Sequence, residues 1–165
     1  MADEKFNNLV SEYGRKVLNI AYGVLGDHQG AMDVHQEVFL AIWKRWHTYD
    51  GQINWDGYLY RTTIRKALDY ARKQRKEKSL DPEFEKQIPS VSNPESNAHA
   101  NELVSILRKC LQKLPAQQAQ AFMLARIEGL GYPQIAATMG CSEGTARVHL
   151  HRALKQLAHE MRDVL

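Results

Sequence analysis

The sequence predicts an all-α protein of two small helical domains: an N-terminal helical bundle and a C-terminal four-helix domain that contains a helix-turn-helix. Two observations support this fold. Apolar residues recur at helical spacing through most of the chain, and the longest interruption, over residues 79–98, holds three prolines and an excess of acidic side chains. We therefore expect a first domain over 1–78, a flexible linker over 79–98 and a second domain over 99–165.

Composition is typical of a soluble globular protein. Hydrophobic residues make up 44% of the chain and charged residues 25%, but no apolar run is long enough to cross a bilayer. The N-terminus lacks the basic and apolar regions of a signal peptide. The two cysteines, Cys110 and Cys141, lie far apart and form no CxxC pair. We therefore expect a cytoplasmic protein with no disulfide framework, no zinc site and no membrane insertion.

Charge is unevenly distributed, although the net charge is only +3. Residues 59–78 carry 8 basic against 2 acidic side chains, and residues 103–165 carry 8 against 4. The stretch between them, 79–102, carries 1 basic against 5 acidic side chains. Two basic blocks separated by an acidic one predict two surfaces that bind polyanions, one on each domain.

The first predicted helix covers residues 5–25. Its apolar stripe is Phe6, Leu9, Val10, Tyr13, Val17, Ile20, Ala21 and Val24. A break at LGDHQG follows, and a second helix is predicted from Gly30 to Trp46.

The second helix carries an apolar stripe and a separate polar face. The stripe is Ala31, Val34, Val38 and Ile42, widened by Phe39, Trp43 and Trp46. The polar face holds Asp33, Gln36 and Glu37. By residue type alone, a solvated surface is the better interpretation of that face.

Residues 47–57 are predicted to form a loop, and Tyr58 to about Lys78 a third helix. One face of this helix is basic and lies beside aromatic side chains. The basic residues are Arg61, Arg65, Arg72 and Lys76, and the aromatic ones are Trp46, Tyr49, Trp55, Tyr58 and Tyr60. Cations that hold phosphates, beside rings that stack on unpaired bases, are typical of single-stranded nucleic-acid sites. The alternative is an aromatic core that lies near a solvated basic helix.

The second domain begins with two helices before its helix-turn-helix. The apolar pattern resumes from about His99 at Leu103, Ile106, Leu107, Cys110, Leu111 and Leu114. Pro115 then starts a helix whose predicted inner face is Ala119, Phe122, Met123 and Ile127.

Residues 131–157 predict two short helices joined by a tight turn. Pro133 suits the first position of the first helix, Gly140 the left-handed residue that ends it, and Ser142 the cap of the second. The inner face of the second helix is Ala146, Leu150, Ala153, Leu154 and Leu157. Its outer face is Gly144, Val148, His151, Arg152 and Lys155, with Arg147 on the flank. A basic outer face favours a helix that lies in the major groove of DNA over an ordinary αα-hairpin.

Enzymatic activity and metal binding are not expected. Asp33, His35 and Glu37 alternate on one helix, where residues i and i+2 point about 200° apart and cannot converge on one ion. The same geometry separates His149 from His151. The chain has no glycine-rich phosphate loop and no nucleophile motif, so we expect no cofactor.

Taken in order, these features resemble the sigma-70 family, in the short extracytoplasmic-function (ECF) type that keeps only regions 2 and 4. The C-terminal motifs are LPAQQAQAFML, EGLGYPQIAATMG and SEGTARVHLHRALKQL. The N-terminal motifs are DVHQEVFLAIWKRW and WDGYLYRTTIRKALDYARKQ. The chain differs from the usual family pattern in having Tyr58 in place of tryptophan, Arg65 in place of asparagine, Gln120 near a usual arginine and Gln134 in place of glutamate.

The resemblance implies two sets of DNA-binding residues. Those implied for the minus-10 element are Trp55, Tyr58, Arg61, Arg65 and Arg72, with the loop around Trp46–Trp55 holding a flipped base. Those implied for the minus-35 element are Thr145, Arg147, Val148, His151, Arg152 and Lys155.

The resemblance also implies protein partners. Asp33, Gln36 and Glu37 would dock onto the β′ clamp helices of core RNA polymerase, and the second domain would meet the β flap. An anti-sigma factor is a further expected partner. The linker would run towards the RNA exit path.

Two other functions fit part of the sequence. One is a two-domain helix-turn-helix regulator that acts without core polymerase, and it would not need the basic, aromatic-flanked third helix. The other is a protein that mimics regions 2 and 4 to titrate an anti-sigma factor, and such a mimic would not need basic DNA-binding faces.

Overall fold

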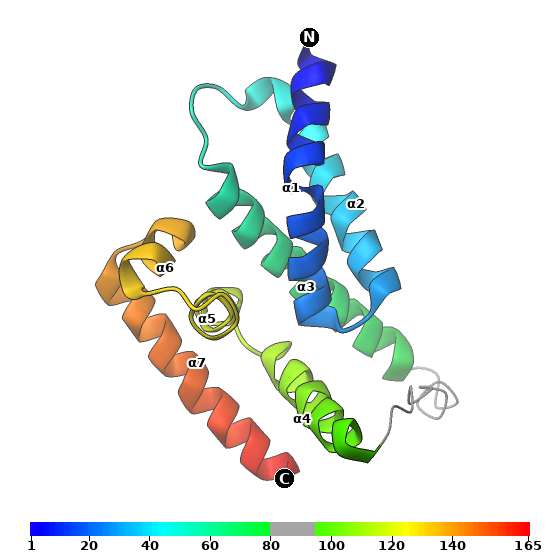
Figure 1. Cartoon of the computed structure of the whole chain (residues 1–165), viewed down its shortest axis with the longest axis vertical. Helices are drawn as coiled ribbons and strands as arrows, with labels where there is room; N and C mark the ends of the chain where they lie inside the picture. The colour runs from blue at the N-terminus through cyan, green and yellow to red at the C-terminus, as the bar shows by residue number, and fades with distance from the viewer. Residues whose placement is uncertain (80–94) are drawn as a thin grey trace.

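The computed structural model describes residues 1–79 and 95–165, and every regular element within those ranges is helical. Figure 1 shows α1, α2 and α3 as one bundle, with α5, α6 and α7 gathered beside it. The all-α fold predicted from the apolar periodicity is confirmed for the part of the chain that the structure describes. Residues 80–94, most of the predicted linker, lie outside the described ranges.

The first bundle consists of three long helices and one short turn of 3₁₀-helix. These are α1 (Ala2–Leu25), α2 (His28–Lys44), η1 (Trp46–Thr48) and α3 (Trp55–Ser79). The third helix therefore begins at Trp55, earlier than the predicted start at Tyr58. The reason is a local cap: the Oδ1 of Asn54 accepts a hydrogen bond from the backbone N–H of Gly57 at 3.2 Å.

The second group of helices begins earlier than predicted. It contains α4 (Glu95–Leu111), α5 (Ala116–Phe122), η3 (Met123–Ile127), α6 (Tyr132–Met139) and α7 (Glu143–Val164). Residues 95–98, which the sequence analysis placed in the linker, are therefore helical and belong to α4.

A π-helical turn changes the inner face of the α5 segment. The N–H of Glu128 bonds to the carbonyl of Met123 at 3.1 Å, which is an i→i+5 bond. The wider turn shifts the register of the residues that follow it. Ile127, predicted to be buried, is 61% exposed, whereas Met123 remains in the core.

The turns of the helix-turn-helix follow the predicted capping chemistry. Gly140 ends α6 with φ 69°, a left-handed conformation that favours glycine. The hydroxyl of Ser142 accepts the N–H of Thr145 at 3.1 Å and so caps α7. Pro133 is the second residue of α6 rather than the first, but it still lies in the first turn, where backbone N–H groups have no intrahelical partner.

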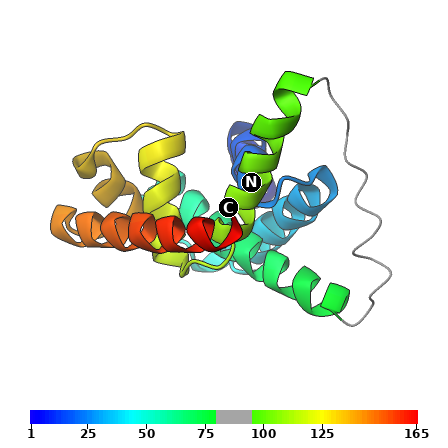
Figure 2. The same cartoon turned by 90° about the horizontal axis from the view of Figure 1, so that it is seen from below.

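The two bundles pack directly on each other through α3. This helix contacts α1 and α2 on one side and α5 and α6 on the other, as Figures 1 and 2 show. Buried side chains from both bundles form one continuous hydrophobic cluster, including Leu59, Ile64 and Leu68 of α3 and Leu114 and Leu124 of the second bundle. The described helices therefore share a core.

Candidate nucleic-acid and partner interfaces

The predicted reading face of α7 is exposed. Ala146, Leu150, Ala153 and Leu157 are buried, and Leu154 is half-buried. The six residues predicted to contact DNA are all exposed: Thr145, Arg147, Val148, His151, Arg152 and Lys155. Burial of one face has left the opposite, basic face in solvent, which is the arrangement that a helix in a major groove requires.

Two of those six side chains have partners within the fold. The hydroxyl of Ser142 donates to the hydroxyl of Thr145 at 2.9 Å, so Thr145 belongs to the cap of α7. The guanidinium carbon of Arg147 lies 4.4 Å from the centre of the Tyr132 ring at the start of α6. The sequence analysis did not single out Tyr132, because helical periodicity gives no information about contacts between two helices.

The basic face of α3 is divided by the packing of the second bundle. Arg65 and Arg72 are exposed, and Arg72 pairs with Asp69 at 3.4 Å on the helix surface. Arg61, which the resemblance places on the DNA, is half-buried instead and donates to the backbone carbonyl of Thr138 in α6 at 2.6 Å. The cause is the close approach of α3 to α6.

Four of the five aromatic residues predicted to stack on bases, Trp46, Tyr49, Trp55 and Tyr58, contact one another, whereas Tyr60 is buried in the core. The rings of Trp46 and Trp55 are stacked with their centres 5.9 Å apart, and Tyr49 meets Trp55 edge-on at 5.3 Å. The hydroxyls of Tyr49 and Tyr58 lie 2.7 Å apart. Burial, reinforced by this hydrogen bond, raises the pKa of Tyr49 to about 12. Trp55 and Tyr58 remain half-buried, so the cluster keeps partly exposed rings.

A pocket of about 370 Å³ connects two of the predicted surfaces. It is lined by four cations of α3 and by acidic and aromatic side chains: Lys66, Arg72, Lys73, Lys76, Glu37, Asp69 and Tyr70. Glu37 comes from the predicted docking face and Arg72 from the predicted minus-10 face. The predicted docking surface and the predicted strand-binding surface are therefore adjacent.

The polar face of α2 is accompanied by exposed apolar side chains. Gln36 and Glu37 are exposed, whereas Asp33 is half-buried and accepts a weak hydrogen bond from the hydroxyl of Tyr70 at 3.4 Å. Burial, followed by the charge of Asp33, raises the pKa of that Tyr70 hydroxyl. The exposed apolar residues beside them are Met32, Leu40 and Trp43.

Trp43, which the sequence analysis placed at the widened edge of the apolar stripe, is 43% exposed. Its ring instead packs against Phe6 of α1, with centres 4.9 Å apart. At about 100° per residue, Met32, Leu40 and Trp43 fall on the same side of α2 as Gln36. That angular position is a signal from which the sequence could have identified them.

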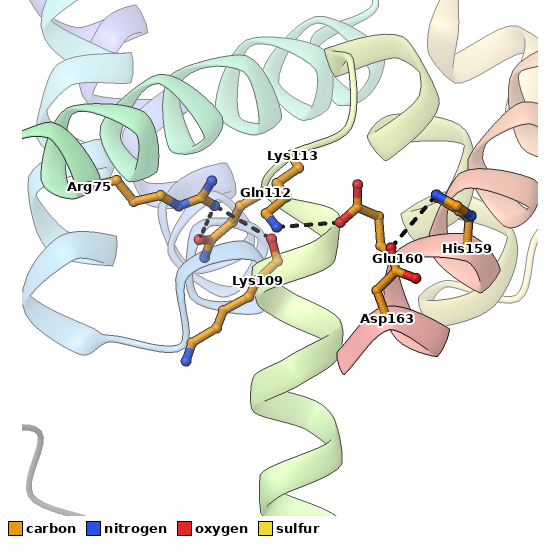
Figure 3. A network of polar contacts seen from close by, with 7 residues as sticks. All are labelled: Arg75, Lys109, Gln112, Lys113, His159, Glu160 and Asp163. Atoms are coloured by element: carbon orange, nitrogen blue, oxygen red, sulfur yellow. Dashed lines mark hydrogen bonds and ion pairs between the residues drawn. The ribbon is translucent and has the colours of Figure 1, made fainter. Parts of the chain in front are cut away.

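The two bundles are also joined by polar contacts around α4, drawn in Figure 3. Arg75 of α3 donates to the side-chain carbonyl of Gln112 at 2.9 Å (Figure 3). Gln112 in turn donates to the backbone carbonyl of Val24 at 2.9 Å. Arg108 donates to the carbonyl of Gly23 at 3.2 Å. The last turn of α1 carries no basic residue, so α4 supplies the donors for its free carbonyls.

A groove of about 900 Å³ lies beside these contacts. The cations that line it are Arg75, Lys78, Arg108, Lys109 and Lys113. Lys113 pairs with Glu160 of α7 at 3.4 Å. The residue before Glu160, His159, lies 3.7 Å from Asp163 on the same helix.

Within residues 1–79 and 95–165, no group of three or more histidine, cysteine or acidic side chains could hold a metal ion. Among the same residues, no helix is long and apolar enough to cross a membrane.

Comparison with known families gives two matches. Residues 9–77 match the family described as Sigma-70 region 2, and residues 105–157 match Sigma-70, region 4.

Relatives with similar sequences carry consistent names. The chain is 32% identical to the ECF RNA polymerase sigma factor SigE of Mycolicibacterium smegmatis, over 92% of this chain but only 60% of that protein. It is 30% identical to the ECF RNA polymerase sigma-E factor of Escherichia coli, over 99% of this chain and 90% of that protein. It is 29% identical to the RNA polymerase sigma-H factor of Pseudomonas aeruginosa, over 97% and 88% respectively.

Two solved structures share the fold. One is the sigma factor RpoE of Bartonella quintana in complex with the anti-sigma factor NepR, with TM-score 0.58 and 21% identity over 96% of this chain and 98% of that one. The other is CnrH in complex with the cytosolic domain of CnrY, with TM-score 0.59 and 20% identity over 98% and 90% respectively.

Proposed function

This chain belongs to the sigma-70 family, in its extracytoplasmic-function type, and we propose that it directs promoter-specific transcription initiation. It does so by binding core RNA polymerase together with the minus-35 and minus-10 elements of promoter DNA. The observation that carries this proposal is the exposed basic face of α7, on which all six expected minus-35 residues are accessible. We propose residues 1–78 as region 2, 79–98 as the linker and 99–165 as region 4. The end of α3 at Ser79 and the start of α4 at Glu95 support extending the two regions to those residues.

In the proposed minus-35 complex, α7 lies in the major groove. Arg152 has a planar fork suited to the O6 and N7 of guanine, and the exposed Val148 suits a thymine methyl group. Lys155 lies nearer the C-terminal end of the helix, where a phosphate is the favoured partner.

In the proposed minus-10 complex, the exposed Arg65 and Arg72 follow the strand backbone, and the partly exposed rings of Trp55 and Tyr58 stack on unpaired bases. Arg61 contributes there only after it leaves Thr138. A pre-melted bubble template tests this role: the Trp55→Ala defect should persist on the bubble if the ring contacts a base. If Trp55→Ala is fully active on the bubble template, Trp55 acts only in melting the duplex.

The proposed docking surface for the β′ clamp helices is the exposed side of α2. Gln36 and Glu37 supply polar contacts, and Met32, Leu40 and Trp43 supply apolar area beside them. An exposed apolar patch rimmed by polar side chains is typical of a protein-binding surface. Region 4 would meet the β flap.

An anti-sigma factor is also a proposed partner. Of the two structures that share this fold, RpoE was solved in complex with the anti-sigma factor NepR, and CnrH in complex with the cytosolic domain of CnrY. The proposed place of action is the cytoplasm, where polymerase and promoter DNA are found. We propose no catalytic role for the chain itself.

Run-off transcription with purified core polymerase and a set of genomic promoters tests the proposal. We expect transcripts that start at specific promoters only when the full chain is added. The competing function is a helix-turn-helix regulator that acts without polymerase. Such a regulator would shift duplex operator DNA by itself as a symmetric dimer and would not co-purify with core polymerase.

A further inference from the structure

The contact between Tyr132 and Arg147 joins the two helices of the helix-turn-helix. Tyr132 is the first residue of α6, and Arg147 lies one turn into α7. The guanidinium carbon of Arg147 is 4.4 Å from the centre of the tyrosine ring, within the range of a cation–π interaction. None of the ion pairs among the described residues includes Arg147.

The ring is held by the fold, and the arginine is not. Tyr132 is half-buried and packs against the hydrophobic core, whereas Arg147 is exposed. A free arginine side chain has large rotamer entropy, which it loses on binding a ligand. Stacking on an immobile ring restricts the rotamers of Arg147 in the free protein. The side chain therefore loses less conformational entropy when it binds DNA.

Stacking also leaves the arginine able to bind. The five N–H donors of a guanidinium lie in its plane and point outward from its edge. A ring that covers one face of the plane therefore does not use the donors. The cation beside Tyr132 can still form a bidentate contact with an anionic oxygen pair.

The position of the pair favours a phosphate over a base. At about 100° per residue, Arg147 lies roughly a quarter turn from the buried face of α7, on its flank, while Val148 and Lys155 lie opposite that face. Its stacking partner belongs to the first helix of the motif, the helix that crosses the DNA backbone in this class of complex. A side chain held between the two helices is at the rim of the groove, where phosphates are found.

We propose that Tyr132 is a positioning residue that holds the Arg147 guanidinium at the rim of the minus-35 groove, where it binds a backbone phosphate. The inference rests on the proposed minus-35 function and changes the role of Arg147 from reading a base to fixing the register of the helix on the duplex. Phosphate contacts of this kind carry affinity and orientation rather than sequence preference.

The test uses holoenzyme assembled from the full chain and core polymerase. The probe is a fork-junction DNA with a fixed single-stranded minus-10 segment and a randomised duplex minus-35 segment, titrated at two salt concentrations. Tyr132→Leu removes the π face, Tyr132→Phe keeps it, and Arg147→Ala removes the cation. The matched control is Tyr22→Leu, because Tyr22 of α1 lies under Arg108 of α4 in a second arginine–tyrosine pair.

We expect Tyr132→Leu to weaken binding of all sequences about two- to fivefold, as loss of an exposed cation–π contact would. Tyr132→Phe and Tyr22→Leu should bind as the unaltered protein does. Arg147→Ala should weaken binding of all sequences and reduce the salt slope by about one. In the Arg147→Ala background, Tyr132→Leu should cause no further loss.

Two results would overturn the inference. Independent, multiplicative losses from Tyr132→Leu and Arg147→Ala would show that the ring does not act through the arginine. A changed base preference in Arg147→Ala would assign the arginine to a base. Failure of the proposed function is distinct, since the unaltered holoenzyme would then show no minus-35 preference at all. Thermal unfolding of each variant separates a folding defect from a binding one.

Discussion

The Nη1 of Arg61 in α3 donates a 2.6 Å hydrogen bond to the backbone carbonyl of Thr138 in α6. This bond ties the helix proposed to follow the minus-10 strand to the first helix of the helix-turn-helix. A guanidinium bonded in this way cannot bind a promoter phosphate through the same N–H. The arrangement of the two bundles and the availability of Arg61 are therefore linked.

Gly57 makes that approach of α3 to α6 possible. A Cβ at position 57 would lie 2.7 Å from the backbone oxygen of Thr138, so Gly57→Ala should force the helices apart and cost about 1–3 kcal/mol. The matched control is Gly144→Ala in α7, where the nearest atom would lie 4.0 Å away. Alanine should stabilise that helix by about 0.5–1 kcal/mol. Denaturant unfolding measures both changes, and equal shifts in the two variants would contradict the close packing.

Tyr60 is 2% exposed, and within the described residues its hydroxyl has no hydrogen-bond partner. Burial, followed by the charge of Glu128, raises the pKa of this hydroxyl. Tyr60→Phe removes the buried polar atom and keeps the ring, so it should stabilise the fold by about 1 kcal/mol. Tyr58→Phe should have the opposite sign, because its hydroxyl is bonded to that of Tyr49. Destabilisation by Tyr60→Phe would mean that the hydroxyl has a partner.

Stability should fall at alkaline pH. In the unfolded chain Tyr49 loses its proton near pH 10, whereas in the folded chain burial and the hydrogen bond with Tyr58 raise its pKa to about 12. Because the folded state keeps the proton longer, this contribution to stability is complete below pH 10 and is lost as the pH rises through 12. Denaturant midpoints at pH 9, 10, 11 and 12 would show the slope. Tyr49→Phe should have a shallower slope, and an unchanged slope would exclude this tyrosine as the source.

Docking on core polymerase should depend on the charge of α2. Glu37 is exposed, so Glu37→Lys should change the free energy of unfolding by no more than about 0.5 kcal/mol while weakening the pull-down of core polymerase. The same loss is expected when Gln36 and Glu37 are both changed to alanine. Glu102→Lys makes the same charge change at an exposed position of α4 and should bind core normally. If Glu37→Lys and Glu102→Lys retain equal amounts of core polymerase in the pull-down, this face of α2 is not part of the docking surface.

Substitutions at two residues of α7 should impair DNA binding in different ways. Arg152→Ala should relax the base preference at one or two minus-35 positions, since a bidentate contact to guanine discriminates by about 1–3 kcal/mol. Lys155→Ala should lower affinity for all sequences alike and reduce the salt slope by about one. The affinities of both variants are measured with holoenzyme, because region 4 shares its hydrophobic core with α3. If Arg152→Ala lowers affinity equally for all minus-35 sequences, Arg152 does not read a base.

The sequence by itself determined which segments are helical and most of the buried and exposed faces. Leu150 and Leu157 are buried and Arg152 and Lys155 exposed as the 3.6-residue period predicts, because the side of a helix on which a residue lies depends only on its position along that helix. The caps at Gly140 and Ser142 were equally local, since each requires only the backbone of a few adjacent residues. The order of the motifs was also enough to identify the family.

Only the tertiary structure decided which faces meet. Periodicity gives the angle of Arg61 around α3, but not that α6 lies at that angle and accepts its hydrogen bond. The contact of the Trp43 ring with Phe6 depends on how α1 and α2 are placed against each other. The contact of Arg147 with Tyr132 likewise depends on how α6 and α7 are placed. Contacts between helices arise from the packing of the whole chain, and no local pattern of residues encodes them.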